Sequence, residues 1–385
     1  MTKKYDLAVV GSGVLGTFHA YHAALLGLKV IVIEKDLFPL EASVRNFGQV
    51  VPSGFPIGRW HHYGRYSTQL YKSFQEKFNI GIRNNGSTYI ASSADELELL
   101  EELQANFAAA DYHSVLLSKE EVLEKYPDIH ANYAVGALSF PQEVSAESRT
   151  MIHHLHAYLK ETTSIQFRYA SPVVGIEDKE TSVELQLSNG DKILATKAIV
   201  CNGRDFRLLF PTVFAKSEIE VCKLNMMVTE PMPEIKLQGN VLTGLTIRRY
   251  ESFKALEGYQ NLKWDSVNQE AIKYGIHILY KQRVDGSIVI GDSHQYADAD
   301  RNEELGFDID MSINKMILEE SKQILNIDHS RIKHFWNGYY AQMKGNEEIF
   351  DKAISKNIKV VTAIGGKGMT ASAGFSKESI ELYFS

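Results

Sequence analysis

Residues 6–16 read Asp6-Leu-Ala-Val-Val-Gly-Ser-Gly-Val-Leu-Gly16, an apolar run that leads directly into three glycines spaced as G-x-G-x-x-G. An apolar helical pattern follows to about Gly27, and a second apolar run occupies Lys29–Ile33. A strand, a glycine turn, a helix and a second strand within about 30 residues predict a βαβ unit that binds a dinucleotide.

Each residue of this motif has its own physical task. Gly11 permits the tight turn, Gly13 lets the backbone approach a pyrophosphate, and Gly16 lets the helix pack closely on the strand. The helix N-terminus adds unpaired N–H groups and the positive end of its dipole. Glu34 ends the second strand, where its carboxylate can accept hydrogen bonds from ribose hydroxyls and disfavours the 2′-phosphate of NADP. The motif alone leaves FAD and NAD open.

The rest of the chain alternates between two textures. Helical patterns lie at Tyr63–Phe78, Asp95–Ala109 and Ser312–Leu325, and Ser145 is expected to cap a further helix. Short strands are predicted in α/β texture at Pro172–Glu177, Val183–Leu187, Lys192–Ala195, Ala198–Cys201 and Lys359–Ala363. Between them, a mainly antiparallel sheet is predicted from Glu220–Thr229, Leu242–Tyr250, Gly275–Gln282 and Ser287–Gly291.

This order of elements favours FAD over NAD. Nicotinamide enzymes usually complete their parallel sheet without a break, whereas this chain leaves the sheet after its second strand and returns much later. The predicted fold class is α/β, with a discontinuous Rossmann-like FAD-binding domain and an inserted, mainly antiparallel β-sheet substrate domain. The predicted FAD-binding domain comprises residues 1–82, 145–215 and 335–385, and the substrate domain comprises residues 83–144 and 216–334.

Composition excludes several other classes of protein. The 385 residues are 44% hydrophobic and 23% charged, as in an ordinary globular chain, with a net charge of −7 and no long run of Lys or Arg. We therefore expect no nucleic-acid partner, and the lack of an 18-residue apolar stretch predicts no membrane span. The first residues enter a strand directly, which leaves no room for a signal peptide. Two cysteines, Cys201 and Cys222, are expected to be buried and reduced in a cytoplasmic protein.

Four segments together resemble the FAD-dependent amine and amino-acid oxidoreductases of the D-amino-acid oxidase, glycine oxidase and sarcosine oxidase family. Beside the N-terminal motif, the sequence around Arg45-Asn46-Phe47-Gly48 resembles the family's stretch over the flavin. Ser171–Glu177 with Lys197–Gly203 resembles the adenine-contacting strand and the small-residue turn beneath FAD. Ala363–Thr370 resembles the glycine-rich turn that faces the flavin N1 and C2 carbonyl. Arg45–Gly48, Gly291–His294 and Gly366–Thr370 also resemble a narrower branch, which gene neighbourhood links to the breakdown of aminophosphonates related to 2-aminoethylphosphonate.

The motif and the resemblance together imply a set of cofactor-binding residues. These are Gly11, Gly13, Val14, Leu15, Gly16, Glu34, Lys35, Arg45, Asn46, Gly48, Gln49, Val173, Cys201, Asn202, Gly203, Gly338, Gly365, Gly366, Lys367, Gly368, Met369 and Thr370. A plainer alternative for Arg45 is a salt bridge that holds its loop. Sarcosine oxidases attach FAD through a cysteine in the C-terminal half, but no cysteine follows Cys222, so FAD is expected to be non-covalent.

A second departure from the family concerns the substrate. Amino-acid oxidases of the family commonly carry an Arg in a Gly-Leu-Arg-Pro stretch before the last strand, and its guanidinium binds the substrate carboxylate. Here the corresponding position is Tyr340, which offers one hydroxyl and no charge. This puts an α-amino acid substrate in doubt, so an anionic group on the substrate must be bound by other residues.

The resemblance implies oxidation of a C–N bond in a small amine, such as an aminophosphonate, by hydride transfer to flavin N5 followed by imine hydrolysis. Oxygen or another acceptor would reoxidise the flavin. The candidate catalytic residues are His294, His277 and Tyr340, and the candidate substrate-binding residues are Arg248, Tyr250, Tyr340 and His294. No metal-binding motif is recognised, so no metal is expected. A 2-hydroxy-acid or amino-acid dehydrogenase and a catalytically silent flavin-binding protein are the alternatives.

Overall fold

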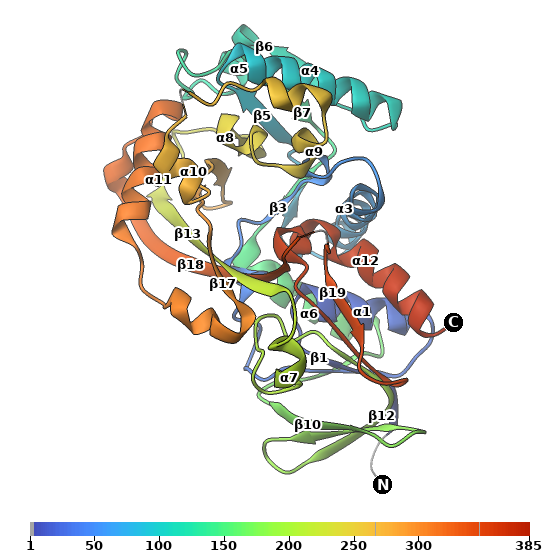
Figure 1. The fold of residues 1–385 in the computed structure, drawn as a ribbon. Coiled ribbons are helices and arrows are strands. Elements are labelled where there is room, and N and C mark those ends of the chain that lie inside the picture. The colour runs from blue at the N-terminus through green and yellow to red at the C-terminus, as the bar shows by residue number, and fades with distance from the viewer. Residues whose placement is uncertain (1–3, 266, 346) are drawn as a thin grey trace.

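The computed structural model describes residues 4–265, 267–345 and 347–385, whose strands form two large sheets and one small sheet. Figure 1 shows one large sheet with helices α1, α6 and α12 beside it and the strands β5, β6 and β7 of the other sheet at the far end of the molecule. The fold is therefore mixed α/β with two β-sheet regions, as the sequence predicts.

The first sheet is built around parallel strands from three separate parts of the chain. Its parallel strands, in spatial order, are β9 (Gln166–Arg168), β2 (Val30–Ile33), β1 (Lys4–Val10), β12 (Lys192–Val200) and β20 (Ile358–Thr362). Antiparallel neighbours extend it, namely β10 (Val173–Asp178), β11 (Val183–Leu187) and β19 (Phe350–Ala353). The two strands predicted at Lys192–Ala195 and Ala198–Cys201 are one continuous strand, because β12 pairs with β1 along its whole length.

Four helices cover one face of this sheet and share a single core with it. They are α1 (Val14–Leu25), α3 (Arg59–Lys77), α6 (Ser148–Thr162) and α12 (Gly368–Tyr383). Leu7, Val9 and Val32 point into this core from alternating positions of β1 and β2. Gly374 lets α12 cross α3 closely, since a Cβ there would lie 2.5 Å from the Cα of Tyr63. The C-terminal helix thus packs beside the N-terminal βαβ unit, as Figure 1 shows.

The second sheet is antiparallel except where β14 pairs with β5. Its strands run in the order β17 (Gln295–Asp298), β13 (Ile219–Pro231), β16 (Ser287–Gly291), β15 (Leu279–Gln282), β14 (Asn240–Leu242), β5 (Ser87–Ala91), β7 (Gly136–Phe140) and β6 (Val115–Ser118). A further strand that the sequence does not predict, β18 (Ile332–Met343), pairs with β13 over nearly its full length. Helices α4 (Ala94–Ala109) and α11 (Met311–Ile324) contribute to the two cores of this sheet.

The short third sheet and several short helices connect these regions. The third sheet contains β3 (Gln49–Val50), β8 (Val144–Ala146) and β4 (Ile82–Arg83). The remaining α-helices are α2 (Ala42–Arg45), α5 (Lys119–Lys125), α7 (Pro211–Phe214), α8 (Gly244–Ile247), α9 (Glu251–Lys254) and α10 (Gln269–Lys273). Ser145 lies within β8 instead of capping α6, because its backbone pairs with Gln49 and Arg83.

Two predicted strands are shorter in the structure, and both lie near the candidate site. Leu242–Tyr250 is helical after Leu242, because Gly244 packs against the buried Glu96 and the backbone turns there into α8. A Cβ on Gly244 would lie 2.5 Å from Oε2 of Glu96, so tertiary contacts override the local strand preference. The strand predicted at Gly275–Gln282 begins only at Leu279.

The domain boundary predicted at residue 335 needs a correction. Residues 335–343 belong to β18 and therefore to the antiparallel sheet, not to the parallel one. The sequence misses this because β18 carries no turn signal at its start and its pairing partner, β13, lies more than a hundred residues earlier. Among the described residues, no helix is both long and apolar enough to cross a membrane.

Candidate functional site

A cavity of about 1050 Å³ lies where the ends of the parallel strands meet the antiparallel sheet. It is lined by the turns after β1, β2 and β12, by the N-terminus of α12, and by residues of the second sheet. Each of the 22 residues predicted from the sequence to bind a cofactor contributes to this lining. The ends of adjacent parallel strands are the usual ligand site of an open α/β sheet, where the chain reverses direction.

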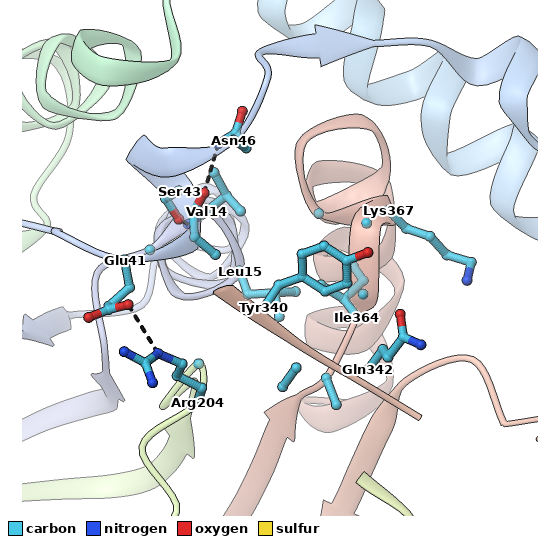
Figure 2. A pocket seen from close by; sticks show the side chains of 18 of the residues that line it. Val14, Leu15, Glu41, Ser43, Asn46, Arg204, Tyr340, Gln342, Ile364 and Lys367 are labelled. Carbon is cyan, nitrogen blue, oxygen red and sulfur yellow. Dashed lines mark hydrogen bonds and ion pairs between the residues drawn. The ribbon is translucent and has the colours of Figure 1, made fainter. Parts of the chain in front are cut away.

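The glycine turn forms one wall of the cavity and leaves no room for side chains. Gly11 has φ +98°, and a Cβ there would lie 2.2 Å from the carbonyl oxygen of Cys201 on β12. A Cβ on Gly13 would lie 2.9 Å from Oγ of Ser43, which accepts a hydrogen bond of 3.0 Å from the backbone N–H of Val14. Figure 2 shows Ser43 and Val14 together at this wall. The sequence did not single out Ser43, which holds the loop after β2 against the glycine turn.

Glu34 lies at the end of β2, in the position the motif predicts. Its side chain is buried, and its Oε2 accepts hydrogen bonds of 2.9 Å from both the N–H and the hydroxyl of Ser12. Ser12 belongs to the glycine turn, so these two bonds fix the carboxylate beside it. A carboxylate in this place accepts hydrogen bonds from ribose hydroxyls.

The loop after β2 passes along the cavity and is held by its own side chains. Arg45 donates from Nε to the carbonyl of Leu40 at 2.7 Å, so this arginine stabilises its loop through a hydrogen bond and not through the alternative salt bridge. Asn46 donates to Ala42 and accepts from the N–H of Gly48, both at 2.8 Å. The Nε2 of Gln49 is buried in the lining and has no hydrogen-bond acceptor among the described residues.

Two ion pairs of opposite polarity link this loop to the turn after β12. Glu41 accepts from Arg204 at 3.2 Å, and Lys35 pairs with Asp205 at 3.3 Å. All four side chains line the cavity, and Figure 2 shows the Glu41–Arg204 pair at its edge. These pairs hold the two loops together across the same end of the cavity.

These features fit FAD. The glycine turn has no space for a Cβ, a carboxylate stands at the end of β2, and the buried amide of Gln49 lacks an acceptor among the described residues. The residues that would hold FAD are those of the glycine turn, Glu34, the loop from Arg45 to Gln49, the turn after β12, and Gly365–Thr370. When bound, FAD would supply a two-electron oxidant for the substrate.

The far end of the cavity carries the polar side chains expected for a substrate. Tyr340 and His294 line it, as do Tyr250 and His277, so the structure brings four of the five predicted catalytic or substrate-binding residues together. Figure 2 shows the Tyr340 ring directed into the cavity near Lys367. Burial raises the pKa of the Tyr340 and Tyr250 hydroxyls, so both tyrosines remain neutral at physiological pH.

Arg248 is the fifth, and the structure does not place it in the cavity. Its buried guanidinium donates to Glu96 at 2.6 Å and to the carbonyl of Lys263 at 2.8 Å, and it pairs with Asp95 at 3.3 Å. Helix α8 turns this side chain towards α4, whereas the predicted continuous strand would have placed it elsewhere. The sequence-based assignment of Arg248 to the substrate is therefore corrected to a structural role.

Arg249, its neighbour, lines the cavity instead. It is half-buried, and its Nη2 donates to the hydroxyl of Tyr296 at 3.0 Å. Among the described residues, no carboxylate forms an ion pair with this guanidinium. The sequence analysis considered the Arg-Arg pair but chose the wrong member, because a helical turn rotates consecutive side chains by about 100°.

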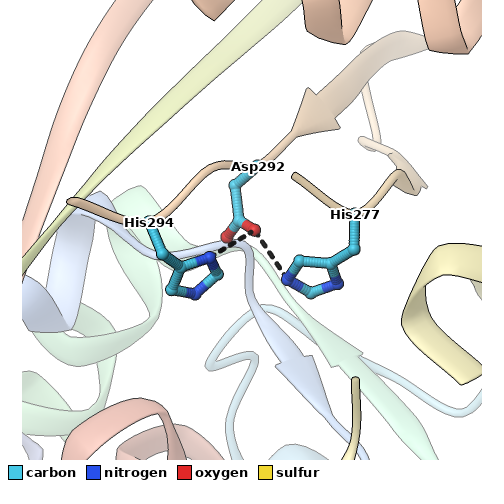
Figure 3. A group of neighbouring side chains, drawn as sticks. All are labelled: His277, Asp292 and His294. Atoms are coloured by element: carbon cyan, nitrogen blue, oxygen red, sulfur yellow. Dashed lines mark ion pairs between the residues drawn. The ribbon is translucent and has the colours of Figure 1, made fainter. Parts of the chain in front are cut away.

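His277 and His294 meet at a carboxylate whose role the sequence analysis missed, Asp292. Nε2 of His277 lies 2.8 Å and Nδ1 of His294 lies 3.9 Å from Oδ1 of Asp292, as Figure 3 shows. Burial lowers the pKa of His294 to about 3, so this histidine is neutral and is a weak proton acceptor. His277 and Asp292 are 15 positions apart in the chain, a spacing that matches no metal-ligand or catalytic motif.

Lys223 and the two cysteines lie outside the polar end of the cavity. The ammonium of Lys223 donates to the carbonyls of Leu305 and Asp308, both at 2.8 Å, and so holds the loop before α11. Cys201 and Cys222 are free and buried, as the sequence predicts. Burial raises the pKa of both thiols, which keeps them protonated and unreactive.

Glu143 lies behind the cavity wall and makes the stability of the protein depend on pH. It is fully buried, and its Oε1 accepts from the N–H of Ser53 at 2.8 Å and from the hydroxyl of Tyr112 at 2.9 Å. Burial raises its pKa to about 7, although these hydrogen bonds oppose the shift. Because the folded-state pKa lies above that of the unfolded chain, its stabilising contribution is complete at low pH and is lost as the pH rises to about 7.

We therefore expect Glu143→Gln to remove a pH dependence of about 3 kcal/mol from the free energy of unfolding. Denaturant unfolding of both proteins at pH 4.5 and pH 8 measures it, and the wild type should lose more stability across this range than the variant. Glu101→Gln, on an exposed position of α4, is the matched control because that carboxyl is in water before and after unfolding. Equal pH dependence in wild type and Glu143→Gln would contradict this account.

Comparison with known proteins agrees with this geometry. The family "DAO: FAD dependent oxidoreductase" matches residues 6–382. One of the two kinds of subunit of an opine oxidase, from Rhizobium meliloti, is 25% identical over 240 residues, which are 58% of this chain and 63% of that relative.

Solved structures share the fold over the whole chain. L-proline dehydrogenase from P. horikoshii has a TM-score of 0.80 and 17% identity, with 99% of this chain and 94% of that chain covered. Glycine oxidase from Geobacillus kaustophilus has a TM-score of 0.76 and 17% identity, with 99% and 95% covered. L-α-glycerophosphate oxidase from Mycoplasma pneumoniae, solved with FAD bound, has a TM-score of 0.76 and 17% identity, with 100% and 95% covered. The glycine turn, the carboxylate at the end of β2, the shared fold and the match over residues 6–382 agree, and the chain belongs to the family of FAD-dependent oxidoreductases.

Proposed function

We propose that this protein uses non-covalent FAD to oxidise a C–N bond in a small amine that carries an anionic group. The proposed substrate is an aminophosphonate related to 2-aminoethylphosphonate. The observation that carries the proposal is Arg249, a guanidinium that lines the cavity and, among the described residues, has only a tyrosine hydroxyl as its hydrogen-bonded side-chain partner. An arginine without a carboxylate partner in a ligand cavity suits a phosphonate or carboxylate group of the substrate.

The charge at this end of the cavity supports a phosphonate. Lys254 also lines the cavity, and it forms no ion pair with a described residue. Lys367 lines it as well but is paired with Glu251 at 3.2 Å. Arg249 and Lys254, which no described carboxylate pairs, together suit a group that can carry two negative charges. The family's usual carboxylate-binding position is Tyr340, which is neutral here.

The names of similar proteins support an amine as the class of substrate. They include an opine oxidase, a glycine oxidase, a proline dehydrogenase and an iminodiacetate oxidase. The chain spans 63% of the opine oxidase chain it matches, so the activity of that protein is support and not identity. Imine hydrolysis in water would complete the reaction, and the electron acceptor that reoxidises the flavin is not assigned.

The chain's own residues would bind and orient this substrate. Arg249 would hold the anionic group, while Tyr340 and Tyr250, neutral because burial raises the pKa of each hydroxyl, would shape the space beside it. The walls formed by Tyr250, Leu279 and the turn before α12 would exclude water from the reacting carbon. His294 would contribute a neutral ring and not a cation, since burial lowers its pKa to about 3.

Anaerobic bleaching of the bound flavin near 450 nm tests the proposal. The panel is 2-aminoethylphosphonate, its 1-hydroxy and N-methyl relatives, glycine, sarcosine, D-alanine and 2-hydroxyglutarate. Bleaching by the aminophosphonates and not by the others is expected. Bleaching by 2-hydroxyglutarate alone would favour the hydroxy-acid dehydrogenase, and no bleaching by any amine would overturn the proposal.

Arg249→Met should lower kcat/KM for the aminophosphonate by about 100-fold, because a charged hydrogen-bond partner of the substrate is lost. Arg249→Lys keeps the charge but not the planar fork and should lose less, about 10-fold. Propylamine, which has no anionic group, is the matched substrate, and any slow bleaching by it should be the same in all three proteins. Equal losses for both amines in Arg249→Met would show that the arginine acts on the fold and not on the anion.

A further inference from the structure

Asp292 is a buried carboxylate at the substrate end of the cavity, and nothing so far gives it a role. It lies between β16 and β17, follows Gly291, and lines the cavity with 7% of its surface exposed. We infer that the Asp292 carboxylate is an ammonium-binding subsite, which binds the protonated amine of the substrate while Arg249 binds the anionic group. This inference deepens the proposed function and rests on it for the choice of substrate.

The carboxylate has unused capacity to accept hydrogen bonds. Its Oδ1 is buried and has no hydrogen-bond donor in correct alignment among the described residues, although Nε2 of His277 approaches to 2.8 Å as an ion pair. A buried acceptor without a donor is costly, so the site favours a ligand that brings an N–H group. Glu220, another carboxylate of the lining, differs because its Oε1 already accepts from Gln342 at 2.7 Å.

The surroundings keep Asp292 ionised. Burial alone would raise its pKa, but the charges of His277, His294 and Arg249 lower it below the ordinary value. The other titratable groups that face it are Tyr250, Cys222 and Tyr340, all of which stay neutral because burial raises the pKa of each. The cavity therefore presents one acceptor with negative charge beside one donor with positive charge, which suits a zwitterion.

His277 holds Asp292 in place from the strand side. The backbone N–H of Asp292 donates to the carbonyl of His277 at 2.8 Å, and the reverse hydrogen bond is 3.1 Å. Nδ1 of His277 lies 3.2 Å from the hydroxyl of Thr246, which anchors the ring from behind. His277 is thus a positioning residue, and the free face of the Asp292 carboxylate is left for the ligand.

A metal ion is the other cation that this cluster could attract, since His277, Asp292 and His294 offer ligand atoms within 4.8 Å of one another. The geometry favours the ammonium. Nδ1 of His294 lies 3.0 Å from the carbonyl oxygen of Gly275, which can only accept, so this nitrogen carries a proton and cannot bind a metal. The guanidinium of Arg249 adds a positive charge that a divalent cation would have to overcome.

The test compares two ligands that differ only in the group facing Asp292, 2-aminoethylphosphonate and 2-hydroxyethylphosphonate, on the FAD-loaded protein under anaerobic conditions. Dissociation constants come from the change in the flavin spectrum, or from the concentration dependence of bleaching where bleaching occurs. The wild type should bind the amine about 10- to 100-fold more tightly than the alcohol. Comparable affinity for the two ligands would overturn the inference.

Variants assign the difference to the carboxylate. Asp292→Asn and Asp292→Ser should bring the two affinities within a few-fold of each other, while the affinity for the alcohol stays close to that of the wild type. The control Glu220→Gln should keep the full preference for the amine. An unchanged preference in both Asp292 variants would overturn the inference, as would stoichiometric Zn²⁺ binding by the wild type that Asp292→Asn abolishes and that competes with the amine.

These outcomes are separate from those of the proposed function. Amines that bleach the flavin equally well in wild type and Asp292→Asn would leave the proposed function standing and remove the ammonium subsite. An Asp292-dependent preference for the amine without any bleaching would keep the subsite and remove the proposed oxidation.

Discussion

Replacing Gly11 by alanine is expected to abolish FAD binding. Gly11 has φ +98°, a conformation that costs a residue with a Cβ about 1–2 kcal/mol. More importantly, the new Cβ would lie 2.2 Å from the carbonyl oxygen of Cys201, and that oxygen belongs to the backbone at the end of β12. Neither β1 nor β12 can move away, because the two strands pair in register from Lys4 to Val10. The clash must therefore displace the glycine turn itself.

The measurement is the ratio of flavin to protein absorbance after purification with added FAD, and we expect it to fall to the background level. Gly27→Ala is the matched control, since Gly27 lies in the same βαβ unit at φ +80° but has no atom within 4 Å of the added Cβ. That variant bears the backbone strain without the clash and should retain FAD. A Gly11→Ala protein with a full flavin complement would contradict the assignment of this turn to the cofactor.

Arg248→Met is expected to lower the free energy of unfolding by about 3–5 kcal/mol, because it leaves a buried carboxylate without its cation. The side chains of Arg248 and Glu96 are 5% and 2% exposed, and their atoms lie 2.6 Å apart. Asp95 also depends on this guanidinium: hydrogen bonds and Arg248 outweigh burial and lower its pKa to about 2. Methionine fills similar space, so the effect reports the lost charge more than a cavity.

Denaturant unfolding of the variants separates charge from packing. Glu96→Gln added to Arg248→Met should recover much of the lost stability, because the double variant no longer buries an uncompensated charge. Arg249→Met, one residue away, should stay within about 1 kcal/mol of the wild type, since this arginine forms no ion pair with a described residue. If the two arginine variants were equally destabilised, the division of the pair into a structural and a ligand-facing member would be wrong.

Sequence patterns predicted the cofactor half of the site well. The G-x-G-x-x-G turn, Glu34 and Gly365–Thr370 all belong to short segments whose local geometry places them at strand ends, and all line one cavity. The strands Ser287–Gly291 and Val183–Leu187 were also predicted with their observed bounds, because turns with Asp-Gly and Asn-Gly delimit them. Local signals of this kind act over a few residues and do not depend on the rest of the fold.

The substrate half was predicted in part, and the errors share one cause. Strand preference over Leu242–Tyr250 suggested that Arg248 faces the ligand, but packing of Gly244 against Glu96 turns the chain into α8 and presents Arg249 instead. Asp292 carried no signal of its own, because His277 reaches it only through the antiparallel pairing beside β15 and β16. The long strand β18 was missed because its partner β13 lies far away in the sequence.

The sequence by itself therefore determined the fold class, the cofactor and the position of the dinucleotide turn, because each depends on contacts between residues close together in the chain. Only the tertiary structure decided which arginine reaches the cavity, and only it brings Asp292 between two histidines. Both depend on the relative rotation of elements that meet across the second sheet. That rotation is set by burial of side chains such as Glu96 and Arg248, whose partners lie about 150 residues apart.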